Sequence, residues 1–187
     1  MRVVIIGNGV AGVTTARGVA ECGVASRLVI YSREHHSYYL RPRLIDVLAG
    51  TVSPEALAQY ADDWYESRGI QAVLGEEAIS IDRPAQQVTF ASGHVELYDR
   101  LVLAIGASSF VPSIPGADRH GVHTLRTMDD ALAIREEAKQ AHNIVCIGGG
   151  LLGLDTSMAL NRRGVTLTIL EALPWLLPRQ LDRDGAT

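Results

Sequence analysis

The sequence has little positive charge and no long apolar run. Lys and Arg number 17 against 21 Asp and Glu, which gives a formal net charge of -4, and Lys139 is the only lysine. Proteins that bind the phosphates of nucleic acid normally carry a basic excess, so nucleic acid is not an expected partner. No apolar run reaches the roughly 18 residues that a membrane-spanning helix needs, so no membrane is expected either.

The N-terminal residues do not have the pattern of a secretory signal peptide. The apolar stretch from Val3 to Ile6 is followed at once by Gly7, and a signal peptide needs an apolar region of about 7–15 residues with a cleavage site behind it. The stretch is instead typical of a strand buried in a parallel sheet. We therefore predict a cytoplasmic protein.

Cysteine is scarce as well. Cys22 and Cys146 lie far apart and form no Cys-x-x-Cys motif, so neither a structural nor a redox-active disulfide is expected. Both have apolar neighbours and are predicted to be small buried residues. The adjacent His35 and His36 point apart in an extended backbone, and the sequence offers no metal site.

The order strand, glycine-rich turn, helix, strand occurs twice. The two turns are Gly7-Asn8-Gly9-Val10-Ala11-Gly12 and Gly148-Gly149-Gly150-Leu151-Leu152-Gly153, and they start 141 residues apart. Each turn follows a predicted strand, at 3–6 and 143–147, and precedes a predicted helix, at 10–22 and 151–163. A second strand follows each helix, at 27–31 and 165–170. This context makes the weak G-x-G-x-x-G motif specific, and it predicts an α/β protein with two Rossmann-like dinucleotide-binding folds.

Each glycine of the motif has a separate physical role. The first allows a tight turn, the second lets the backbone approach a pyrophosphate, and the third lets the helix pack closely. The helix N-terminus then offers N–H groups and a partial positive charge to the phosphates. The residues expected to bind nucleotides in this way are Gly7, Gly9, Val10, Ala11 and Gly12 in the first copy, and Gly148, Gly150, Leu151, Leu152 and Gly153 in the second.

An acidic residue after the second strand would bind ribose hydroxyls. Glu171 ends that strand in the second copy, 23 residues after Gly148. Its charge would repel a 2′-phosphate and so favours NADH over NADPH, although an ordinary surface acid is the alternative. In the first copy Glu34 is the candidate for the adenosine ribose, while Arg33 could face phosphate or solvent.

The residues between the two copies predict further short elements. Ser53 as N-cap and Pro54 at the first helical position predict a helix over 53–68, and the preceding loop of residues 32–52 has room for a short helix. Thr127 and Asp130 predict a capped helix over 127–141. Strands are predicted at 71–74, 78–81, 87–90, 94–97 and 101–105.

Several further motifs carry a resemblance to a known family. They are Tyr39-Leu40-Arg41-Pro42-Arg43-Leu44, Asp63-Trp64-Tyr65-Glu66, Ala104-Ile105-Gly106-Ala107, Pro112 to Gly116, and Arg179-Gln180-Leu181-Asp182. With the two fingerprints, the whole chain resembles the pyridine nucleotide–disulfide oxidoreductase superfamily. Within it, the chain is similar to NADH:rubredoxin oxidoreductases and to the flavin module of NADH-dependent nitrite reductases.

The resemblance implies two cofactors, FAD and NAD(H), and assigns further residues to them. It implies that residues 1–110 form the first part of an FAD-binding domain, and residues 111–187 an incomplete NAD(P)-binding domain. Asp155 takes the place where the family usually has a glutamate near the flavin–nicotinamide contact. The other implied FAD contacts are Arg41 and Pro42 beside the isoalloxazine ring, Ala78 at the adenine, Ala104, Ile105 and Gly106 near the pyrophosphate, and Arg126 on the flavin side.

Three departures from the family pattern modify this expectation. No cysteine lies near Pro42, so electrons would pass from the flavin to an external acceptor, such as rubredoxin, a reductase module or dioxygen. Asp155 is one methylene shorter than glutamate and lacks the usual lysine partner, for which Arg41 or Arg43 could substitute. The chain also ends before the family's return to the FAD fold and its dimerisation domain, so we expect a second polypeptide or a missing C-terminal part to supply them.

The sequence therefore predicts an FAD-dependent NADH oxidoreductase that passes electrons to an external acceptor. A non-catalytic nucleotide-binding subunit with a structural or regulatory role is the alternative. A single-nucleotide dehydrogenase is a weaker one, because the chain has no substrate domain. No motif in the sequence indicates which acceptor is used or what the oligomeric state is.

Overall fold

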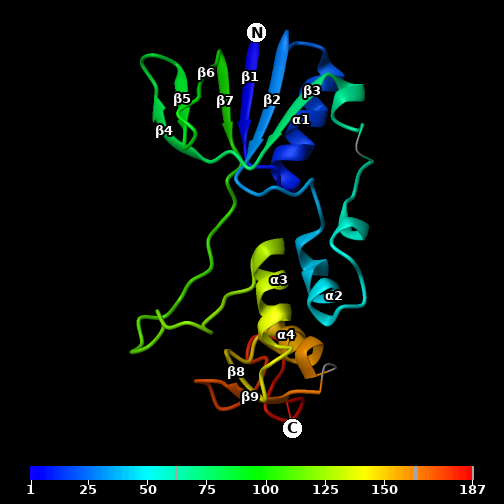
Figure 1. Cartoon of the computed structure of the whole chain (residues 1–187), viewed down its shortest axis with the longest axis vertical. Helices are drawn as coiled ribbons and strands as arrows, with labels where there is room; N and C mark the ends of the chain where they lie inside the picture. Colours follow the sequence, from blue (N-terminus) through cyan, green and yellow to red (C-terminus); the bar gives the residue numbers. More distant parts are fainter. Residues whose placement is uncertain (62, 162–163, 187) are drawn as a thin grey trace. The chain divides into compact units, whose positions relative to one another are not determined.

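The computed structural model describes residues 1–61, 63–161 and 164–186 (Figure 1). These fold into two compact units. The first comprises Met1–Leu40 with Leu57–Ser108, and the second comprises Arg41–Ala56 with Ser109–Thr187. Each unit contains parallel strands and helices, which confirms the predicted α/β class.

A four-stranded parallel sheet forms the centre of the first unit. Its order is β3 (Ile70–Leu74), β2 (Arg27–Ser32), β1 (Arg2–Ile6) and β7 (Arg100–Leu103). The helix α1 (Val10–Cys22) connects β1 to β2. Ile6 pairs with Tyr31 on one side and with Leu103 on the other, so these three strands end at the same edge. In open parallel sheets that edge is where nucleotides bind.

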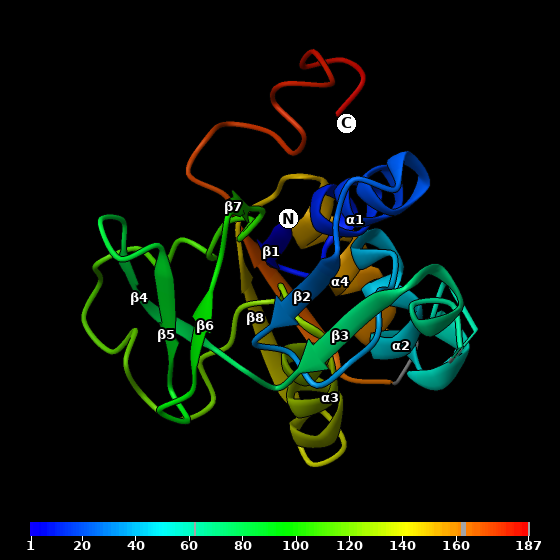
Figure 2. The same ribbon diagram turned by 90° about the horizontal axis from the view of Figure 1, so that it is seen from above.

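Alternating residues of β1 and β2 build two apolar layers. Val3 and Ile5 pack with α1 on one face of the sheet, whereas Val4 and Ile6 pack with Phe90 on the other. On this second face the sheet packs against an antiparallel meander, which consists of β4 (Ala78–Asp82), β5 (Gln87–Phe90) and β6 (Val95–Leu97). Figures 1 and 2 show the meander and α1 on opposite sides of the sheet. Successive side chains of a strand point to opposite faces of the sheet. Because both faces of β1 are covered, all of its central residues are apolar.

One polar cluster joins the meander to the sheet. The carboxylate of Glu96, which is only 7% exposed, accepts hydrogen bonds from Tyr31 Oη at 2.8 Å and from Arg27 Nη2 at 2.9 Å. His94 Nε2 lies 3.5 Å from the same carboxylate. Burial alone would raise the pKa of Glu96, but the hydrogen bond from Tyr31 and the charge of Arg27 outweigh burial and lower it. Burial and Glu96 together raise the pKa of Tyr31.

We predict that Glu96 makes the first unit sensitive to acid. A carboxylate with a lowered pKa in the folded state contributes stability above its unfolded pKa of about 4.3, and that contribution is lost as the pH falls through the folded value. The variant Glu96→Gln should lose about 1–2 kcal/mol at pH 6, because hydrogen bonds to a charged group are replaced by weaker ones. Urea unfolding between about pH 6 and pH 3.5 should show a flatter pH dependence for the variant. Parallel curves for the two proteins would contradict the assignment.

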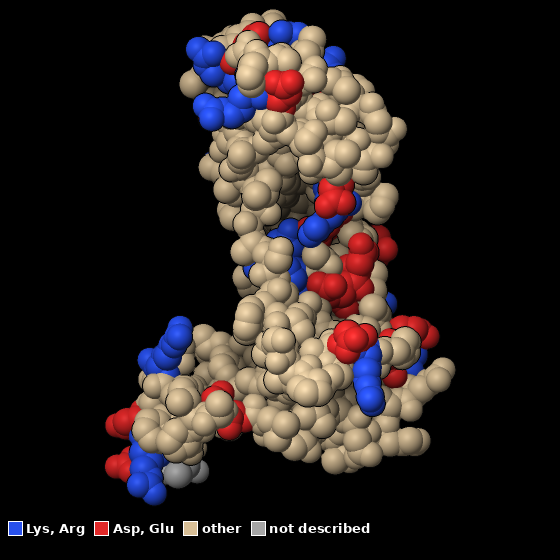
Figure 3. Space-filling view, turned by 90° about the vertical axis from the view of Figure 1, so that its left-hand side faces the viewer, with Lys and Arg blue, Asp and Glu red and all other residues tan. Residues whose placement is uncertain are grey.

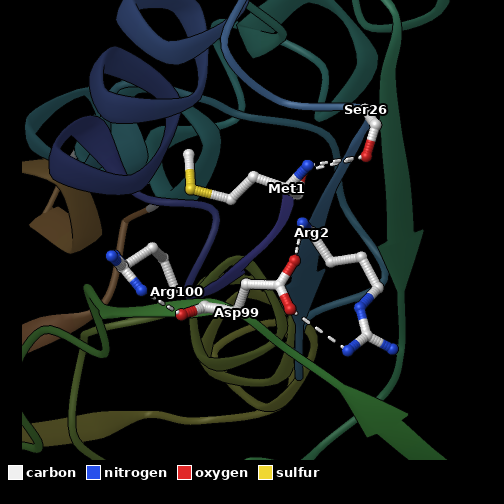
Figure 4. A network of polar contacts seen from close by, with 5 residues as sticks. All are labelled: Met1, Arg2, Ser26, Asp99 and Arg100. Carbon is white, nitrogen blue, oxygen red and sulfur yellow. Dashed lines mark hydrogen bonds and ion pairs between the residues drawn. The ribbon is translucent and has the colours of Figure 1, made fainter.

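A second polar network fixes the beginning of the sheet (Figure 4). The Asp99 carboxylate accepts from the backbone N–H of Arg2 at 2.6 Å and from its Nη2 at 3.2 Å. The backbone bond and the guanidinium of Arg2 lower the pKa of Asp99. Nearby, the N-terminal amine donates to Ser26 Oγ at 2.9 Å. The backbone bond from Arg2 to Asp99 sets the register of β1 against β7, and therefore where the two strands end.

The second unit contains a parallel pair, β8 (Asn143–Ile147) and β9 (Thr166–Leu170), joined by α4 (Leu151–Asn161). A helix α3 (Met128–Glu137) precedes them, and Thr127 and Asp130 form the predicted capping box at its start. A short helix α2 (Leu44–Ala49) packs against α3 and α4, and Leu48 is fully buried there. On the opposite face of the pair, Val145, Ile147 and Leu170 are exposed.

Most of the predicted elements are confirmed, but the helix predicted over 53–68 is wrong. The described residues of this range form two 3-10 turns, η2 (Glu55–Leu57) and η3 (Glu66–Arg68), instead of one helix. Between them Ala58 makes an antiparallel bridge with Tyr39, and the N–H of Gln59 donates to the carbonyl of Tyr38. An extended backbone at these residues is incompatible with a continuous helix. Ser53 still caps the first turn, through a bond from the N–H of Ala56.

Three other expectations are affected. Both cysteines were expected to be buried, but Cys22, the last residue of α1, is exposed and Cys146 is only partly buried; both are free. The predicted helix end near Arg163 lies outside the described residues. The compact units change between Ser108 and Ser109, close to the predicted domain boundary at 110, but residues 41–56 belong to the second unit. The assignment of FAD and NAD domains to 1–110 and 111–187 stays a prediction.

Candidate dinucleotide-binding sites

The two glycine turns have the same backbone geometry. Gly7 has φ of 110° and Gly148 has φ of 114°, values that L side chains rarely adopt. Gly7 N–H donates to the carbonyl of Tyr31 at 2.8 Å, and Gly148 N–H donates to that of Leu170 at 2.8 Å. Each turn is thus fixed to the end of the second strand of its own fold. The repeat seen in the sequence is a repeat of structure.

The third glycine of each motif lies against the first. A Cβ on Gly12 would lie 1.8 Å from the carbonyl oxygen of Gly7, and a Cβ on Gly153 would lie 2.1 Å from that of Gly148. Both obstacles are backbone atoms, which cannot move aside as the end of a side chain could. The predicted close approach of the helix therefore occurs, and its partner is the glycine turn itself.

The second glycine of each motif faces open space. Among the described residues, no atom lies within 4 Å of a Cβ built on Gly9 or on Gly150. No side chain of the described chain caps the N-terminus of α1 at Gly9, and the first turns of α1 and α4 contain no acidic residue. The exposed residues that follow are Val10, Ala11, Leu151 and Leu152. Open space beside uncapped N–H groups fits the pyrophosphate of a dinucleotide.

The strand end predicted to lie near the FAD pyrophosphate is next to the first glycine turn. A Cβ on Gly7 would lie 2.2 Å from the carbonyl oxygen of Ala104, and Ala104 N–H donates to the carbonyl of Ile6 at 2.8 Å. Ile105 follows with an exposed side chain, and Gly106 has φ of 70°. The structure therefore brings residues 104–106 to the same edge of the sheet as the turn.

Tyr65 supports the first glycine turn in a way that the sequence pattern did not indicate. Its hydroxyl donates to Asn8 Oδ1 at 2.9 Å and accepts from the N–H of Tyr38 at 3.3 Å. Burial raises the pKa of Tyr65. Asn8 is buried within the turn, and its Nδ2 has no hydrogen-bond partner among the described residues. Tyr65 thus holds Asn8, the residue between the first two glycines of the motif.

Glu34 lies just beyond the end of β2, as expected of an acid for the adenosine ribose. Its N–H donates to Ser32 Oγ at 3.2 Å, and its carbonyl accepts from Gly75 N–H at 3.1 Å. Its carboxylate accepts from Tyr39 Oη at 2.5 Å. The neighbouring Arg33 is exposed, and its Nη1 lies 3.7 Å from the carboxylate of Glu77. Glu77 directly precedes β4, the first strand of the meander.

Of the residues expected on the flavin side, the structure brings two together and leaves Asp155 without a shown contact to them. Arg41 Nη1 donates to the carbonyl of Arg126 at 2.8 Å, and Pro42 follows Arg41 in the 3-10 turn η1 (Arg41–Arg43). Asp155 is exposed in α4, and Arg43 pairs with Asp46 at 3.0 Å. The structure therefore brings Arg41 and Arg126 together, while the suggested pairing of Asp155 with an arginine stays a prediction. Ala78 begins β4 in the first unit.

Glu171 folds back onto the second glycine turn. Its carboxylate accepts from the N–H of Gly149 at 2.7 Å and from the N–H of Leu173 at 2.9 Å. These backbone bonds, that from Leu173 first, lower the pKa of Glu171. Gly149 directly precedes Gly150 in the chain. The carboxylate of Glu171 therefore lies beside the open space at Gly150, where a dinucleotide would bind.

We predict that Glu171→Gln weakens NADH binding about tenfold and reduces the preference for NADH over NADPH. The amide keeps an oxygen that can accept from the turn, but it loses the charge that favours two ribose hydroxyls and repels a 2′-phosphate. Isothermal titration with both nucleotides measures the change. Glu136→Gln, which alters an exposed acid paired with Lys139 in the same unit, is the control and should leave both affinities unchanged. An unaltered NADH affinity in Glu171→Gln would rule out a ribose contact.

Metal-ligand and membrane features of the described residues indicate no competing site. The described residues contain no group of three His, Cys, Asp or Glu side chains arranged to hold a metal ion. In the part of the chain that the structure describes, no helix is long and apolar enough to cross a membrane. On the face drawn in Figure 3, charged side chains of both signs form small separate groups between broad uncharged areas.

The chain is similar to known flavoprotein reductases along its whole length. The family model described as pyridine nucleotide-disulphide oxidoreductase matches residues 1–186. The NADH-rubredoxin oxidoreductase of Clostridium acetobutylicum is 34% identical over 184 residues, which are 98% of this chain and 48% of the relative. Its crystal structure aligns with a TM-score of 0.87 over 99% of this chain.

Two further relatives are named as parts of other enzyme systems. The biphenyl dioxygenase system ferredoxin–NAD(+) reductase component of Paraburkholderia xenovorans is 36% identical over 98% of this chain and 45% of its own length. The assimilatory nitrate reductase electron transfer subunit of Bacillus subtilis is 34% identical over 99% of this chain and 24% of its own length. The chain thus spans from 24% to 48% of the length of these three relatives.

Proposed function

The chain belongs to the pyridine nucleotide-disulphide oxidoreductase family, and we propose that it forms the nucleotide-binding part of an FAD-dependent NADH oxidoreductase. The observation that carries the proposal is the duplicated glycine turn. In both copies the first glycine is fixed to the end of the second strand, the third packs against the first, and the second faces open space. This geometry, present in both copies, supports two sites for a dinucleotide pyrophosphate in one chain.

We assign FAD to the first site and NADH to the second. In the first, Gly7, Gly9 and Gly12 would hold the pyrophosphate beside residues 104–106, and Glu34 would bind the adenosine ribose. In the second, Gly148, Gly150 and Gly153 would hold the pyrophosphate, and Glu171 the ribose. When bound, the flavin supplies the hydride and electron-transfer chemistry, and the protein supplies binding, orientation and electrostatics.

The residues of the second unit that would serve the flavin–nicotinamide contact are Arg41, Pro42, Arg126 and Asp155. Arg41 donates a hydrogen bond to the carbonyl of Arg126, which fixes the guanidinium of Arg41 next to the backbone of Arg126. This contact supports a role for both residues at the flavin. A guanidinium remains charged at every physiological pH. We propose that the Arg41 guanidinium stabilises negative charge on a bound flavin.

The proposed acceptor is a small external redox protein rather than a disulfide of this chain. The two cysteines are free, and they lie 124 residues apart in different units. The free state of both cysteines supports electron transfer to an external acceptor. The names of the relatives include a rubredoxin oxidoreductase, a ferredoxin reductase and an electron transfer subunit, which supports a rubredoxin-like or ferredoxin-like partner.

We propose that further polypeptide completes the FAD and dimerisation domains. The chain spans 48% of the NADH-rubredoxin oxidoreductase that it resembles. One face of the β8–β9 pair exposes Val145, Ile147 and Leu170. An apolar face on a two-stranded sheet is not stable in isolation, and in doubly wound folds it is covered. The missing segment, in the same chain or in a second one, would cover it.

The proposal is tested with an anaerobic visible spectrum of the purified protein reconstituted with FAD, before and after NADH is added. Flavin bands that bleach on addition of NADH are the expected result. A non-catalytic nucleotide-binding subunit, the alternative, would bind FAD or ADP without bleaching. A protein that binds NADH but no flavin would contradict the assignment of FAD to the first site.

A further inference from the structure

We infer that Tyr39 is a positioning residue for the adenosine ribose, and that it acts by orienting the carboxylate of Glu34. The inference rests on the proposed binding of a dinucleotide at the first site. It adds a residue that lies outside the glycine motif. The observation behind it is the 2.5 Å hydrogen bond from the phenol of Tyr39 to Glu34 Oε2.

The backbone of Glu34 is fixed on both sides of its side chain. Its N–H donates to Ser32 Oγ at 3.2 Å, and its carbonyl accepts from the N–H of Gly75 at 3.1 Å. Ser32 is the last residue of β2, and Gly75 follows β3. The Cα of Glu34 is therefore tied to the carboxyl ends of two strands, at the edge that carries the first glycine turn. Its side chain still has several rotatable bonds.

The phenol of Tyr39 removes much of that remaining freedom, because Tyr39 is itself held in place. It is 6% exposed, its backbone forms a bridge with Ala58, and its ring meets that of His36 edge to face at 6.4 Å. A buried aromatic ring has only two side-chain torsions, so its hydroxyl is a nearly fixed point. The carboxylate of Glu34 is thus oriented before any ligand binds.

A carboxylate oriented in this way suits a ribose with two free hydroxyl groups. An ionised carboxylate accepts about four hydrogen bonds, so the bond from Tyr39 leaves capacity for a ligand. Binding then requires less ordering of the side chain, which improves affinity through preorganisation. The effect should appear only with ligands that use the carboxylate, namely nucleotides that carry a ribose diol.

The test uses the full chain, Tyr39→Phe, Glu34→Ala and the double variant, with ADP and 2′-deoxy-ADP as competitors of FAD. Tyr39→Phe is expected to weaken ADP about fivefold, the size of one hydrogen bond near 1 kcal/mol, and to leave 2′-deoxy-ADP nearly unchanged. In the Glu34→Ala background the same substitution should have no further effect on ADP, because no side chain is left at position 34 for Tyr39 to orient.

The matched control is Tyr38→Phe, which removes the hydroxyl of the adjacent tyrosine, whose ring packs against Tyr60. It should leave both ligands unchanged, and thermal unfolding of each variant monitors the fold. Equal weakening of ADP and 2′-deoxy-ADP by Tyr39→Phe would show a packing role and overturn the inference, as would no weakening of either. A wild-type chain that binds neither FAD nor ADP would instead overturn the proposed function.

Discussion

Replacing Gly12 by alanine is expected to destabilise the first unit by about 3 kcal/mol or more. The added methyl group would lie 1.8 Å from the carbonyl oxygen of Gly7, which is a backbone atom within the glycine turn. The turn is tied to the end of β2 and packs against Ala104, so relief requires α1 to shift from the sheet. Overpacking of this kind typically costs 1–3 kcal/mol and more where the structure cannot adjust. Urea unfolding followed by circular dichroism measures the change.

Gly18 provides the control for this prediction, because it lies in the same helix. Among the described residues, no atom comes within 4 Å of a Cβ built on Gly18. Alanine there should stabilise the unit by about 0.5–1 kcal/mol, through its higher helix propensity. Opposite signs for the two substitutions are expected. If Gly12→Ala unfolded at the same urea concentration as the wild type, the close contact between α1 and the turn would not exist in solution.

Replacing Gly9 by alanine is expected to leave the fold intact and to weaken FAD binding at least tenfold. Gly9 has φ of -84°, which alanine adopts without strain, and its Cβ would meet no described atom within 4 Å. The methyl group would instead occupy the space that a bound pyrophosphate needs for close approach to the backbone. Flavin fluorescence quenching measures the dissociation constant, and a thermal melt verifies the fold.

Gly150→Ala is the reciprocal variant, because Gly150 occupies the equivalent place in the second copy and is equally open. It should weaken NADH binding and leave FAD binding unchanged. The two variants together test which cofactor each turn holds. Should Gly9→Ala weaken NADH while sparing FAD, the assignment of the two cofactors would be reversed; unchanged affinities in both variants would exclude the turns as binding sites.

The elements that the sequence predicted correctly are those set by local backbone requirements. Gly7 and Gly148 need a positive φ, Gly23 ends α1 in the left-handed conformation, and Thr127 caps α3. The helix predicted over 53–68 is wrong because its signals, Ser53 and Pro54, describe only how a helix begins. A bridge from Ala58 to Tyr39, in a different segment, decided the conformation that followed.

The sequence by itself determined the α/β class, the duplicated glycine turns and the family, because each depends on residues close together in the chain. Only the tertiary structure decided which side chains support those turns. Tyr65 holds Asn8, Tyr39 holds Glu34, and Arg41 reaches the carbonyl of Arg126. The first and last of these pairs are separated by 57 and 85 positions. The four residues between Glu34 and Tyr39 form no regular element whose period would predict their contact. Such contacts depend on how the chain folds back on itself, and hydrophobic periodicity carries no information about that.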